Sequence, residues 1–197
     1  GLGAVTAALA LLGTFREAAY HESALGTLAH RLELRMVRHV AYRVGLGFDD
    51  DPRFATAVLV GFPSADTSYV DVVNFGHEPP LVVTPGGVRS LPPGEGLPLG
   101  LTDMGDDGLP PTLRVPLAPG ETLLLVTDGV SEARDATGEF FPLRDRVADA
   151  IAEDPSAAEP GSLVRLVRDG TLRHCSGRLD DDTAILAVRR PPSAGGE

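Results

Sequence analysis

Apolar residues at helical spacing fill the first part of the chain and predict two helices. Residues 4–20 are rich in alanine and leucine and contain no proline, which favours a helix. Apolar side chains occur on nearly all sides of this helix, so we expect it to be largely buried. In residues 22–43, leucines are interspersed with arginines such as Arg31, Arg35 and Arg38. That pattern is typical of an amphipathic helix on the protein surface.

The pattern changes after the acidic turn at 49–52, where the apolar runs become short and rich in valine. Turn-forming residues separate these runs, as in successive β-hairpins. One run, 123–126, is continuously apolar, as in a strand covered on both faces. The predicted hairpins join 54–62 to 68–75, 81–84 to 88–91, and 112–117 to 121–127.

The last part of the chain predicts two further helices and a strand. Pro142 begins a helix over 142–153, and Ser162 can cap a helix over 163–174. An apolar strand at 183–188 follows. The order of two helices, about six strands, two helices and a strand predicts an α+β fold, with antiparallel sheets and helices packed outside them.

Length and charge exclude several classes of partner. A chain of 197 residues is ample for one domain with a real core. Its net charge of −11 repels phosphate backbones, and it contains no run of five basic residues. We therefore predict neither a nucleic-acid nor a membrane partner. The most apolar stretch, residues 4–15, is too short to span a bilayer, which takes roughly 20 residues.

The chain has a single cysteine, Cys175, so no intrachain disulfide can form. This fits a reducing compartment, and we predict a cytoplasmic protein. The adjacent His174 allows Cys175 to be interpreted as a nucleophile. A lone cysteine is more often a small buried apolar residue, and we favour that interpretation.

The remaining candidate chemistry is acidic, because the sequence lacks a Walker loop, a Gly-x-Ser-x-Gly elbow and a His-Glu-x-x-His motif. Asp128 follows the apolar run 123–126 and precedes Gly129, and Asp180–Asp182 precede the last strand. Taken singly, each group is more often a turn or a solvated loop. Together, at neighbouring strand ends, they would supply oxygen ligands suited to Mg²⁺ or Mn²⁺.

His77 is a further candidate, within Asn74-Phe75-Gly76-His77-Glu78-Pro79-Pro80. It could act as an acid or base or contact a phosphate. A histidine beside glycine and before proline more often orders a turn through its own hydrogen bonds, and this interpretation is favoured.

Several motifs occur in one order along nearly the whole chain, to about Arg190, and together resemble the SpoIIE/RsbU-type branch of the type 2C metal-dependent protein phosphatases. Two are specific, the Asn-x-Gly-His-x-Pro-Pro block at 74–80 and the Thr-Asp-Gly-Val-x-Glu-Ala-Arg block at 127–134. The others support them by order and spacing. They are Phe54-Ala55-Thr56, Leu97-Pro98-Leu99-Gly100, the run 119–126 and Asp180-Asp181-Asp182-Thr183.

The resemblance implies a four-layer α-β-β-α sandwich with a centre of two Mn²⁺ or Mg²⁺ ions. It implies hydrolysis of phosphoserine or phosphothreonine by a metal-activated water, with a phosphorylated anti-anti-sigma protein of the STAS type as the substrate. Carried over by position, Asp128 and Asp180 are metal ligands and Asp181 is their neighbour. Asp182 takes the variable position, with a one-residue ambiguity of register. No catalytic residue is implied beyond these ligands.

The family also carries an Asp-x-x-Gly-x-Gly segment and an aspartate upstream of it. Gly1 fits the last glycine, so both aspartates would precede residue 1. We therefore predict a phosphatase domain at 1–190 that lacks its first strands and binds at most one metal ion, followed by a flexible tail at 191–197. A sheet edge left exposed by the missing strands would favour a homodimer. The alternative is a catalytically inactive module for docking or regulation.

Overall fold

The computed structural model describes residues 2–48, 54–94, 96–102 and 108–190. The expectations for Gly1, the turn at 49–52 and the tail at 191–197 therefore lie outside the described residues. The chain divides into two compact units. The first is built from segments 1–63, 70–77 and 93–115, and the second from the remainder.

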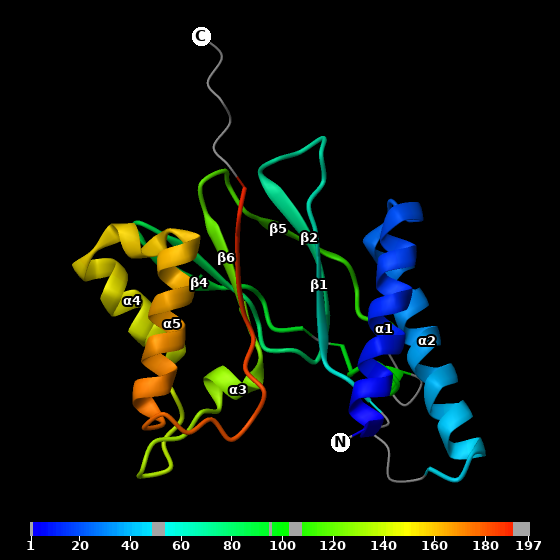
Figure 1. Ribbon diagram of the computed structural model, residues 1–197. Helices are drawn as coiled ribbons and strands as arrows, with labels where there is room; N and C mark the ends of the chain where they lie inside the picture. The colour runs from blue at the N-terminus through cyan, green and yellow to red at the C-terminus, as the bar shows by residue number, and fades with distance from the viewer. Residues whose placement is uncertain (1, 49–53, 95, 103–107, 191–197) are drawn as a thin grey trace. The chain divides into compact units, whose positions relative to one another are not determined.

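The first unit pairs two helices with a three-stranded sheet (Figure 1). Helices α1 (Leu2–His21) and α2 (Leu25–Gly45) pack against each other, and α2 contacts strand β1 (Ala57–Gly61). The sheet order is β1, then β2 (Tyr69–Phe75), then β5 (Leu113–Pro116). Strands β1 and β2 form the predicted antiparallel hairpin.

Helix α2 is amphipathic, as its sequence predicts. Leu28, Leu32 and Met36 recur every four residues, are buried, and form one core with apolar residues of the sheet. Glu33 is also buried, and its carboxylate accepts hydrogen bonds from the Gly100 amide at 2.8 Å and the Thr102 hydroxyl at 2.6 Å. These bonds anchor the segment around residue 100 to the helix.

Helix α1 differs from its prediction, because it is not largely buried. Its buried residues include Ala7 and Ala18, whereas Val5, Leu9 and Leu12 are 53%, 65% and 53% exposed. The side that faces α2 carries small residues, which allow the two helices to approach closely. The larger apolar side chains project from other sides, where no described element of the first unit covers them.

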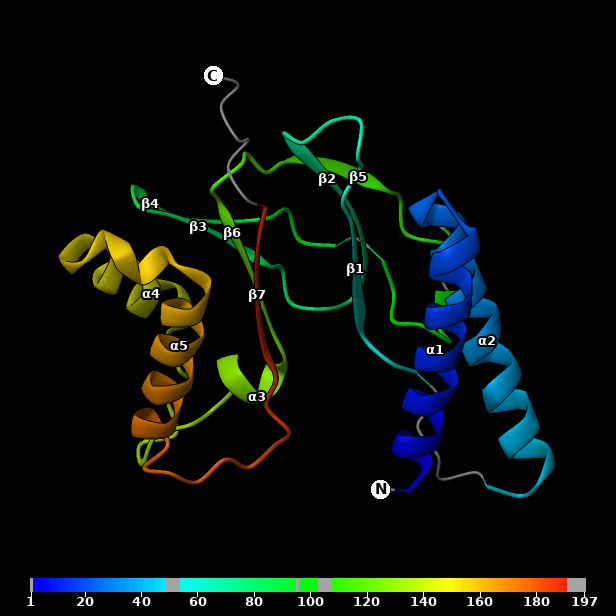
Figure 2. The same ribbon diagram turned by 45° about the horizontal axis from the view of Figure 1, so that its top comes forward.

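The second unit contains a four-stranded antiparallel sheet covered by helices (Figures 1 and 2). Its order is β4 (Gly87–Ser90), β3 (Leu81–Thr84), β6 (Thr122–Val126) and β7 (Ile185–Arg189). The single-turn helix α3 (Asp128–Ser131) follows β6. Helix α4 (Leu143–Glu153), the 3₁₀ turn η2 (Pro155–Ala158) and helix α5 (Pro160–His174) precede β7.

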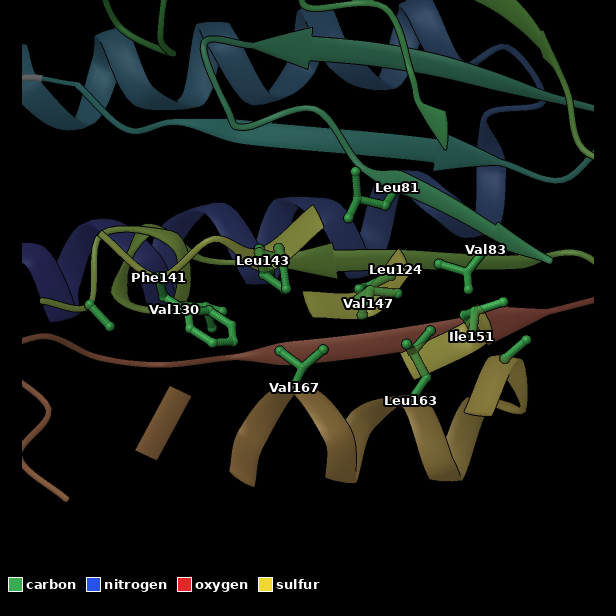
Figure 3. Close-up of a cluster of buried hydrophobic side chains, with 13 residues drawn as sticks. Leu81, Val83, Leu124, Val130, Phe141, Leu143, Val147, Ile151, Leu163 and Val167 are labelled. Atoms are coloured by element: carbon green, nitrogen blue, oxygen red, sulfur yellow. The ribbon is translucent and has the colours of Figure 1, made fainter. Parts of the chain in front are cut away.

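The core of the second unit lies between this sheet and its helices. Leu124 of β6 meets Val147 of α4 and Leu163 and Val167 of α5, and all are almost fully buried (Figure 3). Strand β6 lies between β3 and β7, which confirms the prediction that 123–126 is a covered strand. Among the described helices of the chain, none is long and apolar enough to cross a bilayer.

Two further predictions are wrong. The third hairpin does not form, because β5 belongs to the sheet of β1 and β2 while β6 pairs with β3 and β7. The expected turn exists, with the Glu121 amide bonded to the Ala118 carbonyl at 3.0 Å, but it leads from one sheet to the other. Ser162 is not the cap of α5, which begins at Pro160 after Glu159. Its hydroxyl accepts a bond from Arg165 instead.

Candidate metal centre

The two predicted acidic groups meet at one edge of the second sheet. Strands β6 and β7 are antiparallel neighbours, and Val126 at the end of β6 is paired with Ile185 at the start of β7. The residues after β6 therefore lie beside those before β7. Asp128 and the 180–182 loop are brought together by this register, although 52 positions separate Asp128 from Asp180 (128 to 180).

Thr127 joins the two segments through three hydrogen bonds. Its amide donates to the Ala184 carbonyl at 3.1 Å, and its hydroxyl accepts from the Ala184 amide at 2.9 Å. The same hydroxyl donates to the Asp182 carbonyl at 3.1 Å. The residue before Asp128 thus continues the strand ladder into the acidic loop.

Gly129 lies against the backbone of the acidic loop. A Cβ atom at this position would stand 2.5 Å from the Asp182 carbonyl oxygen and 3.1 Å from the Thr183 hydroxyl. That hydroxyl also lies 3.4 Å from the Gly129 carbonyl. The glycine after Asp128 is therefore required by a close approach of two chain segments, and not by a turn that needs a positive φ angle.

The carboxylates at this edge are exposed and have few partners. Asp128 is the first residue of α3, and its Oδ1 accepts from the Gly129 amide at 3.0 Å. The carboxylate of Asp181 accepts from the Asp182 amide at 2.7 Å. Within the described ranges, no arginine forms an ion pair with Asp128 or with Asp180–Asp182. Such a concentration of negative charge favours a cation.

The donor set fits a divalent cation only in part. The side chains are the hard oxygen donors that Mg²⁺ and Mn²⁺ prefer, and both segments are held in place. However, no three His, Cys, Asp or Glu residues in the described part of the chain are grouped closely enough to hold a metal ion. The described residues therefore bring together only part of the donor set that a metal site requires.

The sequence does not predict a contact between Ser131 and Glu78. The Ser131 hydroxyl, at the end of α3, donates to the Glu78 carboxylate. Both residues line a cavity of about 510 Å³ beside α3. Each lies in one of the two specific motif blocks, which is the signal that could have identified the pair.

The turn at His77 is ordered by the Asn74 side chain and not by the imidazole. The buried Asn74 holds the backbone of His77 with two bonds, accepting from its amide at 2.7 Å and donating to its carbonyl at 2.8 Å. Gly76 between them has a φ angle of +64°, which favours glycine. Among the described residues, the imidazole of His77 has no hydrogen-bond partner.

Cys175 is a small buried residue, which is the interpretation that its sequence favours. Its thiol is buried and lies 3.6 Å from the Leu172 carbonyl. The neighbouring His174 bonds to the Glu139 carbonyl at 2.9 Å and packs its ring edge-on against Phe141. His174 is thus engaged away from the thiol.

Solved structures identify the class of protein that has this fold. The RsbU and RsbW domains of Rv1364c from Mycobacterium tuberculosis match with a TM-score of 0.69 and 24% identity, over 98% of this chain and 49% of that one. The phosphatase domain of SpoIIE from Bacillus subtilis (Mn presoaked) matches with a TM-score of 0.57 and 11% identity, over 95% of this chain and 76% of that one. The fold is that of the PP2C-type protein phosphatases.

The particular family follows from the sequence comparison. The family model for stage II sporulation protein E matches residues 1–191, so this chain belongs to the SpoIIE family. Protein IcfG of Synechocystis is 27% identical over 142 residues, which are 72% of this chain and 21% of that protein. The chain thus spans about a fifth of the length of this curated relative.

Proposed function

We propose that this chain is the catalytic domain of a metal-dependent phosphatase that hydrolyses phosphoserine or phosphothreonine on a protein. The observation that carries this proposal is the contact of Gly129 with the Asp182 backbone. This contact holds Asp128 and the 180–182 loop at the same edge of the sheet. Membership of the SpoIIE family supports the same function.

In this proposal Asp128 and Asp180 are ligands of Mn²⁺ or Mg²⁺. Such an ion would neutralise charge on the phosphoryl group and promote attack by water. Asp181 shapes the loop, because its carboxylate accepts the Asp182 amide. Thr127 fixes the spacing between the two segments through its hydroxyl. The one-residue ambiguity within Asp180–Asp182 is resolved by substituting each residue in turn.

We further propose that the substrate is a phosphorylated STAS-type anti-anti-sigma protein and that the phosphatase works in bacterial cytoplasmic signalling and stress response. The support is the resemblance to the SpoIIE/RsbU-type branch, together with the net charge of −11, which disfavours nucleic acid. Homodimerisation stays a prediction.

Phosphate release from a phosphoserine peptide in the presence of Mn²⁺ tests the proposal. The assay uses this chain and an extended form that carries upstream residues. Asp128→Asn should reduce the rate on the order of 100-fold or more, because it weakens binding of the metal ion whose positive charge would stabilise the transition state. Asp149→Asn, an exposed position on α4, is the matched control and should leave the rate unchanged. Metal-independent release, or full activity of Asp128→Asn, would refute the proposal.

A module for docking or regulation without catalysis is the second candidate. The observation that favours it is the lack of three grouped metal-binding side chains in the ranges that the structure describes. Titration with Mn²⁺ separates the two functions. We expect weak binding by this chain and at least about tenfold tighter binding by an extended form that supplies further carboxylates. Equally weak binding by both forms would favour the non-catalytic module.

A further inference from the structure

A second cavity, of about 290 Å³, lies between helices α4 and α5 and away from the residues of the candidate metal centre. Its walls are apolar and are formed by Phe141, Val147, Leu166 and Val167. Three basic side chains complete its lining, Arg146 from α4 and Arg173 and His174 from α5. An apolar pocket with a few convergent polar groups is the usual form of a small-molecule site.

Three of the apolar wall residues belong to the packed core of the second unit. Val147 and Val167 are each 1% exposed, and both point into the same cluster as Phe141 (Figure 3). A Cβ atom at Gly170 would stand 3.0 Å from Cζ of Phe141, so the glycine lets the aromatic ring lie against the backbone of α5. The packed core thus forms the inner wall of the cavity.

In the described part of the chain, neither Arg146 nor Arg173 forms an ion pair. Arg173 contributes to lowering the pKa of Asp169, but the main cause of that shift is the hydrogen bond from Arg168. That bond, at 2.8 Å, already engages the carboxylate of Asp169. Two guanidinium groups at one cavity therefore favour an external anion.

His174 fixes one end of the cavity. Because a carbonyl oxygen only accepts hydrogen bonds, Nε2 of His174 carries the proton in its 2.9 Å bond to Glu139. The ring also stacks edge-on with Phe141, with the ring centroids 5.5 Å apart. Residue 139 belongs to a loop that Asp135 orders through bonds from Thr137 and Glu139. The end of α5 is thus held against an ordered loop.

We propose that this cavity binds a small amphipathic anion, with an aromatic or branched aliphatic body and one terminal carboxylate or phosphate. The apolar walls take the body, and Arg146 and Arg173 pair with the charged end in charge-assisted hydrogen bonds. The volume suits a ligand of about ten non-hydrogen atoms, near the lower limit for such pockets. A ligand of that size binds with a Kd on the order of 0.1–1 mM.

The position of the cavity connects it with the candidate metal centre. Five residues, 175–179, lead from the end of α5 to Asp180, and residues 132–140 lead from α3 to Phe141. Two residues of its lining, Phe141 and His174, are therefore joined by short stretches of chain to the two acidic segments. The binding itself does not depend on the proposed phosphatase activity.

Protein-detected NMR titration of the chain, without metal, tests the proposal. The probes are phenylacetate, phenyl phosphate and the neutral phenylacetamide. The two anions should shift amide signals of α4 and α5 and saturate below about 10 mM, and phenylacetamide should bind at least about tenfold more weakly. The tighter of the two anions identifies carboxylate or phosphate as the natural charged group. Equal binding of the neutral amide, or no saturation by either anion, would overturn the proposal.

Three variants locate the site. The double change Arg146→Gln and Arg173→Gln should raise the Kd for phenylacetate at least about tenfold. Leu166→Trp should block binding by filling the cavity while both arginines stay. Arg144→Gln, an exposed arginine on α4 outside this cavity, should leave the Kd unchanged. A thermal melt of each variant confirms folding. If the folded double variant or Leu166→Trp bound like the parent chain, the site would be refuted.

Discussion

The candidate metal edge and the Asn74–His77 turn both place a glycine next to polar residues just after a strand, yet they use the glycine differently. At the metal edge, Gly129 lies against the Asp182 carbonyl, from a part of the chain more than fifty positions away. At the turn, Gly76 has a φ angle of +64°, and the polar bonds join Asn74 to His77, three residues on. The first glycine serves tertiary packing, whereas the second serves local geometry and also lies close to Pro98, whose ring would be 3.2 Å from a Cβ atom there.

The difference shows what a local sequence pattern can specify. The hydrogen bonds of the turn at 74–77 join its own residues, so the turn can be predicted from them, although Gly94 and Pro98 also pack closely on it. The Asp-Gly pair at 128–129 looks like a turn in isolation, but its glycine is explained only by the segment that packs on it. Substitutions at the two sites should therefore differ in size and in the property that they affect.

The largest effect is expected for Gly129→Ala. The new Cβ would be 2.5 Å from a backbone carbonyl, so one of the two segments must shift. We expect a loss of about 3 kcal/mol in the free energy of unfolding, as for a severe overpacking change. Urea unfolding measures it, and Mn²⁺ affinity should fall in parallel if the metal site is as proposed.

Gly13→Ala is the matched control for this prediction. Gly13 lies within α1, and a Cβ atom there would meet no other atom within 4 Å. Alanine is the better helix former, so this change should stabilise the chain by about 0.5–1 kcal/mol. If Gly129→Ala were as harmless as Gly13→Ala, the close approach at the metal edge would be disproved.

Asn74→Ala should have the next largest effect. It removes two hydrogen bonds in a buried position and leaves the amide and carbonyl of His77 without their partner. Because buried polar groups without a hydrogen-bond partner are destabilising, we expect a loss of about 2 kcal/mol in the free energy of unfolding. The change should leave Mn²⁺ affinity intact, whereas Gly129→Ala should not. A parallel loss of metal binding in Asn74→Ala would remove the distinction between the two sites.

The sequence predicted well those features that depend on nearby residues. The hairpins of β1 with β2 and of β3 with β4 are examples, since each is specified by a turn and two alternating runs. The adjacency of the two acidic groups also followed from the motif order. The pairing of β5 and β6 was mispredicted, because a turn at 119–120 does not determine whether its flanking strands share a sheet.

Other features that depend on distant segments could not be predicted. The exposure of Leu9 follows from which side of α1 faces α2, and apolar composition does not determine that side. The contact of Ser131 with Glu78 joins residues 53 positions apart, and the buried Glu33 receives bonds from residues near position 100. Each of these depends on how the elements pack in three dimensions, whereas the sequence pattern predicts only their order along the chain.

Thr127→Val should have a smaller effect, located at the metal edge. Valine keeps the shape of threonine but removes the hydroxyl that accepts from the Ala184 amide and donates to the Asp182 carbonyl. Water can reach this edge, so we expect a loss of about 1 kcal/mol in unfolding free energy. Thr127→Ser keeps the hydroxyl and should retain most of the stability. Equal losses for valine and serine would show that these hydrogen bonds do not hold the segments together.

The smallest effect is expected in a third polar turn, around Asp135, whose interactions are local and exposed. Its carboxylate accepts hydrogen bonds from the Thr137 hydroxyl and from the Glu139 and Thr137 amides. These bonds lower the pKa of Asp135, and the bond from the Thr137 hydroxyl contributes most. Because the folded pKa lies below the unfolded one, the stabilisation is present at neutral pH, above the unfolded pKa. This stabilisation is lost as the pH falls through the pKa of Asp135 in the folded state. The advantage of the parent chain over Asp135→Asn should therefore shrink on acidification. An NMR titration should place the Asp135 midpoint below that of the same residue in an unfolded peptide, and an equal or higher midpoint would contradict the prediction.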